Sequence, residues 1–214
     1  MTWVLENLSL IWARTWSHLA LAVPAIALSF LVSVPLGWVA HRYRWSRLAL
    51  LTGAGLMYAI PSLPLFIVLP TIIGVGVRDA LNVIVALTLY GMALMVRSAA
   101  DALASVGEAV RLSATALGYS SARQFWEVDL PLAGPVLLAG LRVVAVSTIS
   151  LVTVSGLLGV PNLGLLFTDG FQRGLIAEVV TGIVATVVLA LLVDGVLVLG
   201  GRAVMPWAKA VRTT

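Results

Sequence analysis

Polar side chains that stand alone in apolar surroundings are the first candidates for chemistry in this sequence. Asp194 is an isolated acid within a long run of apolar residues. A carboxylate in such a run is a functional-site candidate by default. A structural ion pair explains it as well, and Arg142 is the partner that we expect. Gly182, Thr186 and Ala190 precede Asp194 at four-residue intervals, which indicates a helix face turned toward other helices.

Hydroxyl and aromatic groups in other apolar runs are candidates for lining a solute pathway. Ser147, Ser150 and Thr153 lie in one run. They suit either a path for a hydrated or zwitterionic solute or hydrogen bonds between helices, and the sequence leaves both open. Tyr58 and Tyr90 could offer aromatic faces to a quaternary ammonium group.

The sequence gives no support for an enzyme. It has no cysteine, and its single lysine, Lys209, follows Ala208, so no G-K-[ST] phosphate loop is present. His18 and His41 are far apart in the sequence, and we expect no metal site. Paired carboxylates or a nucleophile with a supporting base are not evident. The basic residues are too few and too scattered for nucleic-acid binding.

The composition indicates a membrane protein. Hydrophobic residues make up 61% of the chain and charged residues 10%, whereas a soluble domain carries roughly 25% charged residues. The ~30 Å hydrocarbon core needs about 20 helical residues. Five apolar runs are long enough, so we predict an all-α membrane protein with about five transmembrane helices. The runs are Leu19–Ala40, Leu48–Val77, Ala80–Val96, Val136–Val160 and Ile176–Gly201.

The second run, residues 48–77, contains three prolines at Pro61, Pro64 and Pro70. Proline removes a backbone donor and kinks or breaks a helix. The run is therefore predicted to be either one broken helix or a helix followed by a re-entrant piece.

The basic residues predict the orientation. Ten of the thirteen fall in one alternating set of loops and three in the other. Cytoplasmic loops carry the excess of Lys and Arg, so the larger set should face the cytoplasm, with the N-terminus outside and the C-terminus inside. The larger set is Arg42, Arg44, Arg47, Arg97, Arg111, Arg123, Arg142, Arg202, Lys209 and Arg212, and the smaller is Arg14, Arg78 and Arg173.

The two ends of the chain differ from the predicted transmembrane domain, residues 19–204. Leu5, Leu8, Trp12 and Trp16 recur at helical spacing among polar residues. This predicts that residues 1–18 form a short amphipathic helix on the outer membrane surface, a frayed terminus being the alternative. Residues 205–214 are predicted to be a cytoplasmic tail.

The long polar segment, residues 98–135, is the predicted cytoplasmic loop. Its pattern indicates two short helices separated by Gly118, which permits the positive φ that ends a helix. Ser120 or Ser121 can cap the second helix, and Pro131 is expected to stop it. Phe125 and Trp126 in that helix should pack on other helices, enter the headgroup layer or fill a groove on a partner.

The same loop resembles the conserved cytoplasmic loop of permeases of the binding-protein-dependent ABC importers. That pattern is E-A-A, three residues, G, nine residues, I-x-L-P. Gly118 and Val128-Asp129-Leu130-Pro131 reproduce its second half with the same spacing. Leu112 stands where the family has Glu, and Glu108 lies one helical turn earlier. Val34–Gly37, Ile60–Leu63, Leu89–Arg97 and Gly156–Gly164 are similar to the osmoprotectant subgroup, which imports glycine betaine, carnitine and choline.

The resemblance implies a type I ABC importer permease fold, in which the helix after Gly118 is a coupling helix seated on a separate ATPase. Implied partners are an ATPase dimer that holds ATP and Mg, a second permease that is identical or related, an extracytoplasmic binding protein and membrane lipid. The chain itself is expected to bind no cofactor. The implied coupling residues are Gly118, Tyr119, Ser121, Arg123, Phe125, Trp126, Leu130 and Pro131.

Three functions therefore compete. The first is import of a compatible solute, expected to be a quaternary amine, through the bacterial inner membrane by alternating access. The second is import of another small solute such as an amino acid, and the third is a stand-alone secondary transporter in which Asp194 couples to an ion. The docking helix favours the first two. Residues 156–164, rich in glycine, are expected to form a flexible turn near Val160 that acts as an outer gate.

Overall fold

The computed structural model describes residues 2–207, and all of their regular structure is helical, which confirms the all-α prediction. A π turn, Phe125–Asp129, precedes α8, and a 3₁₀ turn, Gly156–Leu158, follows it. The α-helices are α1 Thr2–Glu6, α2 Leu8–Arg42, α3 Arg44–Ala59, α4 Ser62–Ile73, α5 Ala80–Ala104, α6 Glu108–Ala116, α7 Ser121–Gln124, α8 Leu130–Ser155, α9 Leu165–Gln172 and α10 Ile176–Val204.

Four of the helical stretches are each long and apolar enough to cross a membrane. They are α2, α5, α10 and the continuous stretch Ser121–Leu158 that contains α8. The pair α3 and α4 passes the same test only together and is bent by 107°. Counting that pair as one broken span gives five, as predicted, and the break falls at Pro61, the first of the three prolines.

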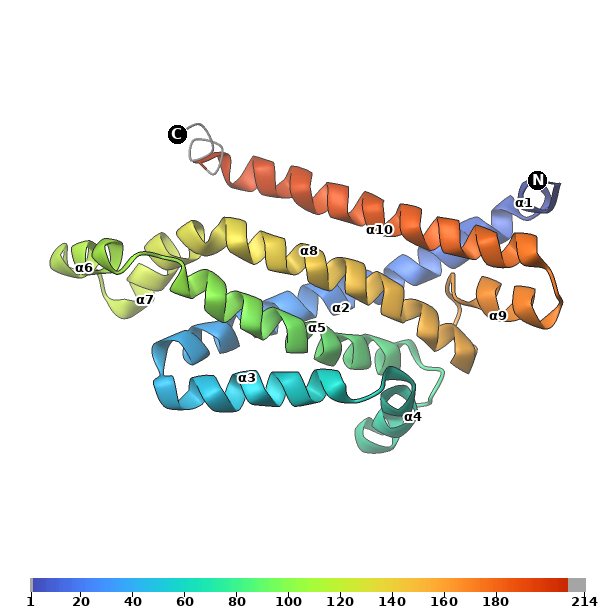
Figure 1. Cartoon of the computed structure of the whole chain (residues 1–214), viewed down its shortest axis with the longest axis horizontal. Coiled ribbons are helices and arrows are strands. Elements are labelled where there is room, and N and C mark those ends of the chain that lie inside the picture. Colours follow the sequence, from blue (N-terminus) through green and yellow to red (C-terminus); the bar gives the residue numbers. More distant parts are fainter. Residues whose placement is uncertain (1, 208–214) are drawn as a thin grey trace.

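The elements gather at two opposite ends of the bundle (Figure 1). The α6–α7 loop and the C-terminal end of α10 lie at one end, whereas the N-terminus, α4 and α9 lie at the other. We call these the loop end and the α4–α9 end. Helix α5 is the central helix and contacts α2, α3, α4 and α8, while α10 contacts α8 and α9.

Helices α2 and α5 approach closely because small residues face each other. A Cβ added at Gly91 would lie 2.1 Å from Ser29 Oγ, and one added at Gly37 would lie 2.5 Å from the Cβ of Ala99. Without a hydrophobic effect between helices in lipid, such close contacts are a main source of helix association.

Two carbonyl groups of the second span lack backbone donors because the residues four positions later are prolines. Pro64 and Pro70 lack the N–H groups that would bond to the carbonyls of Ile60 and Phe66 in a continuous helix. Helix α5 supplies both missing donors. Tyr90 Oη donates to Ile60 O at 2.5 Å, and Asn82 Nδ2 donates to Phe66 O at 2.9 Å. The broken span is therefore held in place by side chains of the central helix.

The N-terminal segment differs from the expected separate amphipathic helix. Helix α2 begins at Leu8, so residues 8–18 continue the first spanning helix after the short α1. Burial explains the continuity, because His18 is fully buried and hydrogen-bonded to Ile149 O, while Trp12 and Trp16 remain exposed. At 1.5 Å per residue the 35-residue α2 is about 52 Å long, so it must tilt or extend beyond the hydrocarbon core.

One basic residue lies elsewhere than predicted. Arg142 was counted in a cytoplasmic loop, but it lies three turns inside α8. Without Arg142, the basic residues are still distributed unequally between the two ends of the bundle, because Arg42, Arg97 and Arg123 are near the loop end. Lys209 and Arg212, with most of the predicted tail 205–214, fall outside the described residues.

Candidate coupling loop and solute pathway

The predicted turn at Gly118 is present, with a specific geometry. Gly118 has φ +82°, its N–H bonds to Thr115 O at 3.0 Å, and the N–H of Tyr119 bonds to Ala114 O at 3.1 Å. This pair of bonds is a Schellman motif, which satisfies the last carbonyls of α6 and reverses the chain. Ser120 then caps α7 by accepting from the N–H of Arg123 at 3.4 Å, so Ser120 rather than Ser121 is the cap.

The helix after Gly118 does not stop at Pro131, contrary to the expectation from sequence. Residues 121–158 form one continuous helical stretch, with the π turn between α7 and α8. The Leu130 N–H bonds to Phe125 O, five residues back. This wider turn shifts the register of the backbone hydrogen bonds by one residue just before Pro131. The proline ring therefore avoids the carbonyl oxygen with which it would clash in a regular α-helix. The predicted coupling residues are thus a direct extension of α8.

The two aromatic residues of this segment divide between two environments. The Phe125 ring packs edge-to-face on Trp38 of α2, with centroids 5.8 Å apart, and on Trp126 at 5.1 Å. Trp126 itself is 65% exposed, and Leu112 of α6 and Leu117 at its end are 64% and 78% exposed. Phe125 therefore anchors the segment to the bundle, whereas Trp126 remains largely exposed.

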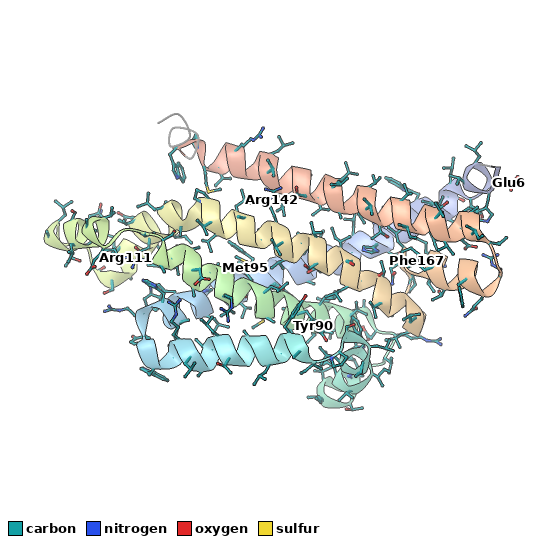
Figure 2. All side chains as sticks on the ribbon, in the orientation of Figure 1. Glu6, Tyr90, Met95, Arg111, Arg142 and Phe167 are labelled. Carbon is teal, nitrogen blue, oxygen red and sulfur yellow. The ribbon has the colours of Figure 1, made fainter. Side chains whose placement is uncertain are left out.

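Arg111 is a functional candidate that the sequence did not reveal (Figure 2). Its guanidinium reaches three elements at once: Nε donates to Asp129 Oδ1 at 2.9 Å, Nη1 lies 2.6 Å from His41 Nε2, and Nη2 donates to Leu103 O at 2.5 Å. Asp129 is buried. The partners are 18, 70 and 8 positions away, so only the fold brings them together. We call Arg111, Asp129 and His41 the Arg111 cluster.

Arg123, by contrast, makes local contacts on the surface of α7. It bonds to both carboxylate oxygens of Glu127, at 3.0 and 2.9 Å, and its guanidinium carbon lies 4.5 Å from the Tyr119 ring centroid. Both members of the ion pair are about half exposed, so the pair stabilises the short helix only modestly.

Asp194 forms an ion pair with Arg142. This is one of the two interpretations of Asp194 that the sequence allowed. Arg142 Nε and Nη2 donate to the two carboxylate oxygens at 2.6 and 2.7 Å. This bidentate geometry is the strongest form of such a pair. It joins α8 to α10 within the spans (Figure 2 labels Arg142).

The remaining pathway candidates form two separate groups. Tyr58 and Tyr90 pack edge-to-face with centroids 6.1 Å apart, and Tyr90 is buried whereas Tyr58 is exposed. On α8, Ser150 is exposed, Ser147 is half-buried, and Thr153 Oγ1 donates to Ser150 O at 2.6 Å. Among the described hydrogen bonds, none joins the tyrosines to these hydroxyls.

The segment expected to be a flexible outer gate is tightly folded. Val160 and Asn162 are buried, Asn162 Nδ2 donates to Ser155 Oγ at 3.0 Å, and Asn162 Oδ1 accepts from Gly164 N at 2.6 Å. A Cβ at Gly164 would lie 2.0 Å from Thr153 O. Gly164 thus lets the turn pack directly on α8, and the role of this segment as an outer gate stays a prediction.

A bundle of broken and unbroken helices long and apolar enough to cross a membrane defines a multi-pass membrane protein. Residues 29–205 match the family described as binding-protein-dependent transport system inner membrane component. The chain belongs to this family.

Curated relatives and a solved structure agree with this assignment. The chain is 30% identical to the osmoprotectant import permease protein OsmW of Salmonella typhimurium (strain LT2), over 91% of this chain and 92% of that protein. It is 27% identical to the glycine betaine/carnitine/choline transport system permease protein OpuCB of Bacillus subtilis (strain 168), over 96% and 94%. A structure of the MetNI methionine ABC transporter superposes with a TM-score of 0.79 at 20% identity, covering 93% of this chain and 98% of that one. The fold is therefore that of a type I ABC importer permease, and the protein is a permease component of an ABC transporter.

Proposed function

We propose that this permease imports a compatible solute, a quaternary amine such as glycine betaine, choline or carnitine, by alternating access. The relatives named above for these solutes support that substrate class. We also propose that the loop end faces the cytoplasm, because Arg42, Arg97, Arg123 and Arg202 are near it and Lys and Arg mark the cytoplasmic side. The N-terminus is then outside and the C-terminus inside.

The exposed apolar tip of the loop is the observation that carries the proposal. Leu112 and Leu117 are exposed in the loop before the helical stretch 121–158, and Trp126 is exposed near the start of that stretch. Large exposed apolar side chains of this kind suit contact with a partner. Leu112 replaces the family's glutamate, so the substitution enlarges the apolar contact. We assign this tip to a groove on the ATPase, with Gly118, Tyr119 and Trp126 at the contact.

The proposed assembly contains two permeases, two ATPase subunits that bind ATP and Mg, and an extracytoplasmic binding protein. This chain has no phosphate-loop motif with which to bind ATP itself. ATP closes the ATPase dimer, the dimer moves the α7 segments, and the pathway opens toward the loaded binding protein. ATP can drive this change only because it binds one state better than the other.

Tyr58, Tyr90, Ser147, Ser150 and Thr153 remain our candidates for contacts with the solute. The paired rings of Tyr58 and Tyr90 offer aromatic faces suited to a quaternary ammonium. Asp194 supports a stand-alone secondary transporter less well, because both of its carboxylate oxygens are already bonded to Arg142.

Uptake into proteoliposomes tests the proposed function. The complete complex, with ATP on the side of the ATPase, should accumulate radiolabelled glycine betaine, and unlabelled choline or carnitine should compete. Competition by methionine but not by the quaternary amines would indicate that the substrate is an amino acid rather than a quaternary amine. Uptake that follows an ion gradient without any ATPase would overturn the importer assignment.

Gly118→Leu tests the coupling role of the loop. A side chain at φ +82° costs about 1–2 kcal/mol, so the turn should change shape and separate ATP hydrolysis from transport. We expect ATPase activity that binding protein and solute no longer stimulate. Gly107→Leu is the matched control, since Gly107 lies in the same loop at φ −60° with open space around an added Cβ. Equal coupling in the two variants would contradict the assignment.

A further inference from the structure

A groove of about 930 Å³ lies between α2, α8 and α10 in the half of the bundle nearer the loop end. Phe30, Val34 and Trp38 of α2 form one wall, and the C-terminal part of α10 forms the other. Leu137 and Leu141 of α8 lie on the floor. We call this space the α2–α10 groove.

The lining of the α2–α10 groove is unsuited to the transported solute. Among the residues that the structure describes, no charged side chain lines it. Placing a zwitterion or cation there without polar partners would be strongly unfavourable. The polar groups that line it include three indoles, Trp38, Trp126 and Trp207, all toward the loop end. Indole rings favour the boundary between headgroups and hydrocarbon.

The length of the groove matches one leaflet of a bilayer. It extends along α10 from Val196 to Val204, which is about 12 Å at 1.5 Å per residue, and continues to Trp207 just beyond the helix. Half of the ~30 Å hydrocarbon core is about 15 Å. With the three indoles at the interface, the groove reaches from the headgroup layer to near the middle of the membrane.

The groove faces away from the proposed solute pathway. Leu141 lines the groove, and Ser150 lies nine residues further along α8. Nine residues are two and a half helical turns, so the two side chains point to opposite sides of α8. If a second permease meets this one across the pathway at Ser150, the groove is turned toward the surrounding lipid.

The mouth of the groove carries uncompensated positive charge. Arg42 follows the groove-lining Trp38 by one helical turn, so it lies on the same face of α2. It is exposed, and within the described part of the chain it forms no ion pair. A free guanidinium group beside an apolar groove complements a molecule with an anionic head and an apolar chain.

We infer that the α2–α10 groove binds an acyl chain of an anionic phospholipid of the cytoplasmic leaflet, with its phosphate beside Arg42. The inference rests on the orientation proposed above. Phe125 and Trp126 line the same groove, so the bound chain touches the segment proposed to couple to the ATPase. Burial of the acyl chain against these side chains supplies the affinity, at about 25 cal/mol for each Å² removed from water.

Photolabelling of the full complex in nanodiscs tests the site. The probe is phosphatidylglycerol with a diazirine in one acyl chain, and the labelled peptides are mapped by mass spectrometry. We expect labels in residues 122–141 and 196–207, and competition by unlabelled phosphatidylglycerol. Phosphatidylcholine carrying the same diazirine should label these peptides several-fold less; equal labelling would overturn the anionic headgroup.

Two glycines of α10 provide a matched pair of variants. Gly200 lines the groove and Gly195 does not, and a Cβ added at either meets open space. Gly200→Phe should fill the groove and lower the labelling about tenfold, the effect of ~1.4 kcal/mol of lost affinity. Gly195→Phe should label as the unmodified protein does. Equal labelling of the two variants overturns the acyl-chain site.

Two further measurements keep the outcome clear. Arg42→Gln leaves the apolar lining intact and should remove the preference for phosphatidylglycerol over phosphatidylcholine. A disulfide between two copies carrying Leu197→Cys would show that a second permease fills the groove, which overturns the lipid site. A preparation that transports solute but shows no groove labelling contradicts the lipid site alone, and one that is labelled but does not transport contradicts only the proposed function.

Discussion

At the scale of single residues, two ion pairs differ in what they do for the protein. Arg111 ties Asp129, His41 and the end of α5 together where Asp129 is buried. The Arg123–Glu127 pair is local and exposed. Removing one member of a buried pair leaves a charged partner without compensation, whereas exposed pairs contribute ~0–1 kcal/mol.

Arg111→Met should therefore destabilise the loop and weaken coupling, whereas Arg123→Met should do neither to a comparable degree. The unpaired Asp129 carboxylate should cost about 1–3 kcal/mol. Protease sensitivity of residues 98–135 and the ratio of ATP hydrolysed to solute transported provide the measurements. If Arg123→Met proves the more damaging variant, the Arg111 cluster is not what holds the loop.

The Arg142–Asp194 pair allows a test of its role by double substitution. Asp194→Asn and Arg142→Leu should each lower the melting temperature of the detergent-solubilised protein, because each leaves one charge unpaired within the spans. The double variant should recover most of the loss. Failure of the double variant to recover stability while single variants abolish transport would instead indicate that Asp194 has a direct role in transport.

Sequence reasoning succeeded and failed among these residues for identifiable reasons. Asp194 and Arg142 could be matched because each was a charged group expected near the same membrane depth. Arg111 could not be matched to Asp129, since both lie in a polar loop with several other charges and nothing in their spacing selects the pair. The Gly118 turn was predictable because only glycine readily adopts that conformation.

At the scale of elements, proline has opposite effects at two places. In the second span, carbonyls left without donors by Pro64 and Pro70 bond to side chains of α5, and the helix bends by 107°. Before α8, a π turn lets the helix pass Pro131 without a break. The sequence showed where the prolines are, but the outcome depends on whether a neighbouring helix supplies donors, which the sequence does not show.

Tyr90→Phe tests whether the α5 donor holds the bend. It removes the hydrogen bond to Ile60 O and nothing else, so stability should fall by about 1 kcal/mol. Spin labels placed on α3 and α4 should report a wider range of distances. Tyr58→Phe is the control, because no hydrogen bond from the Tyr58 hydroxyl is described. Similar distance distributions for the two variants would argue against this anchoring role.

At the scale of the whole molecule, the structure separates the polar loop from the α4–α9 end by the length of the spans (Figure 1). The number of spans and the helical class were predictable, because long apolar runs have few alternatives in a membrane. Helix α9 was not predicted, and the turn before it was predicted to be flexible. The turn is instead held by the amide of Asn162, which bonds to Ser155 and Gly164, and nothing in the spacing of these residues indicates those bonds.

The proposed orientation can be checked directly, since the chain has no native cysteine. Cysteines introduced at the exposed Ser121 and Gln172 lie at opposite ends. In intact cells a membrane-impermeant maleimide should label Gln172→Cys and not Ser121→Cys. Labelling should reverse in inside-out vesicles; the reverse pattern in intact cells would invert the topology.

The continuity of α7, the π turn and α8 makes the proposed coupling segment one arm of a lever. From Ser121 to Arg142 the stretch spans 21 residues, about 32 Å at 1.5 Å per residue. With α10 joined at Arg142 as the fulcrum, a tilt of about 5° displaces Ser121 by about 3 Å. A small tilt of α8 thus displaces the start of α7 by a distance of atomic size. In the other direction, a force applied at Ser121 acts on α8 through an arm of about 32 Å.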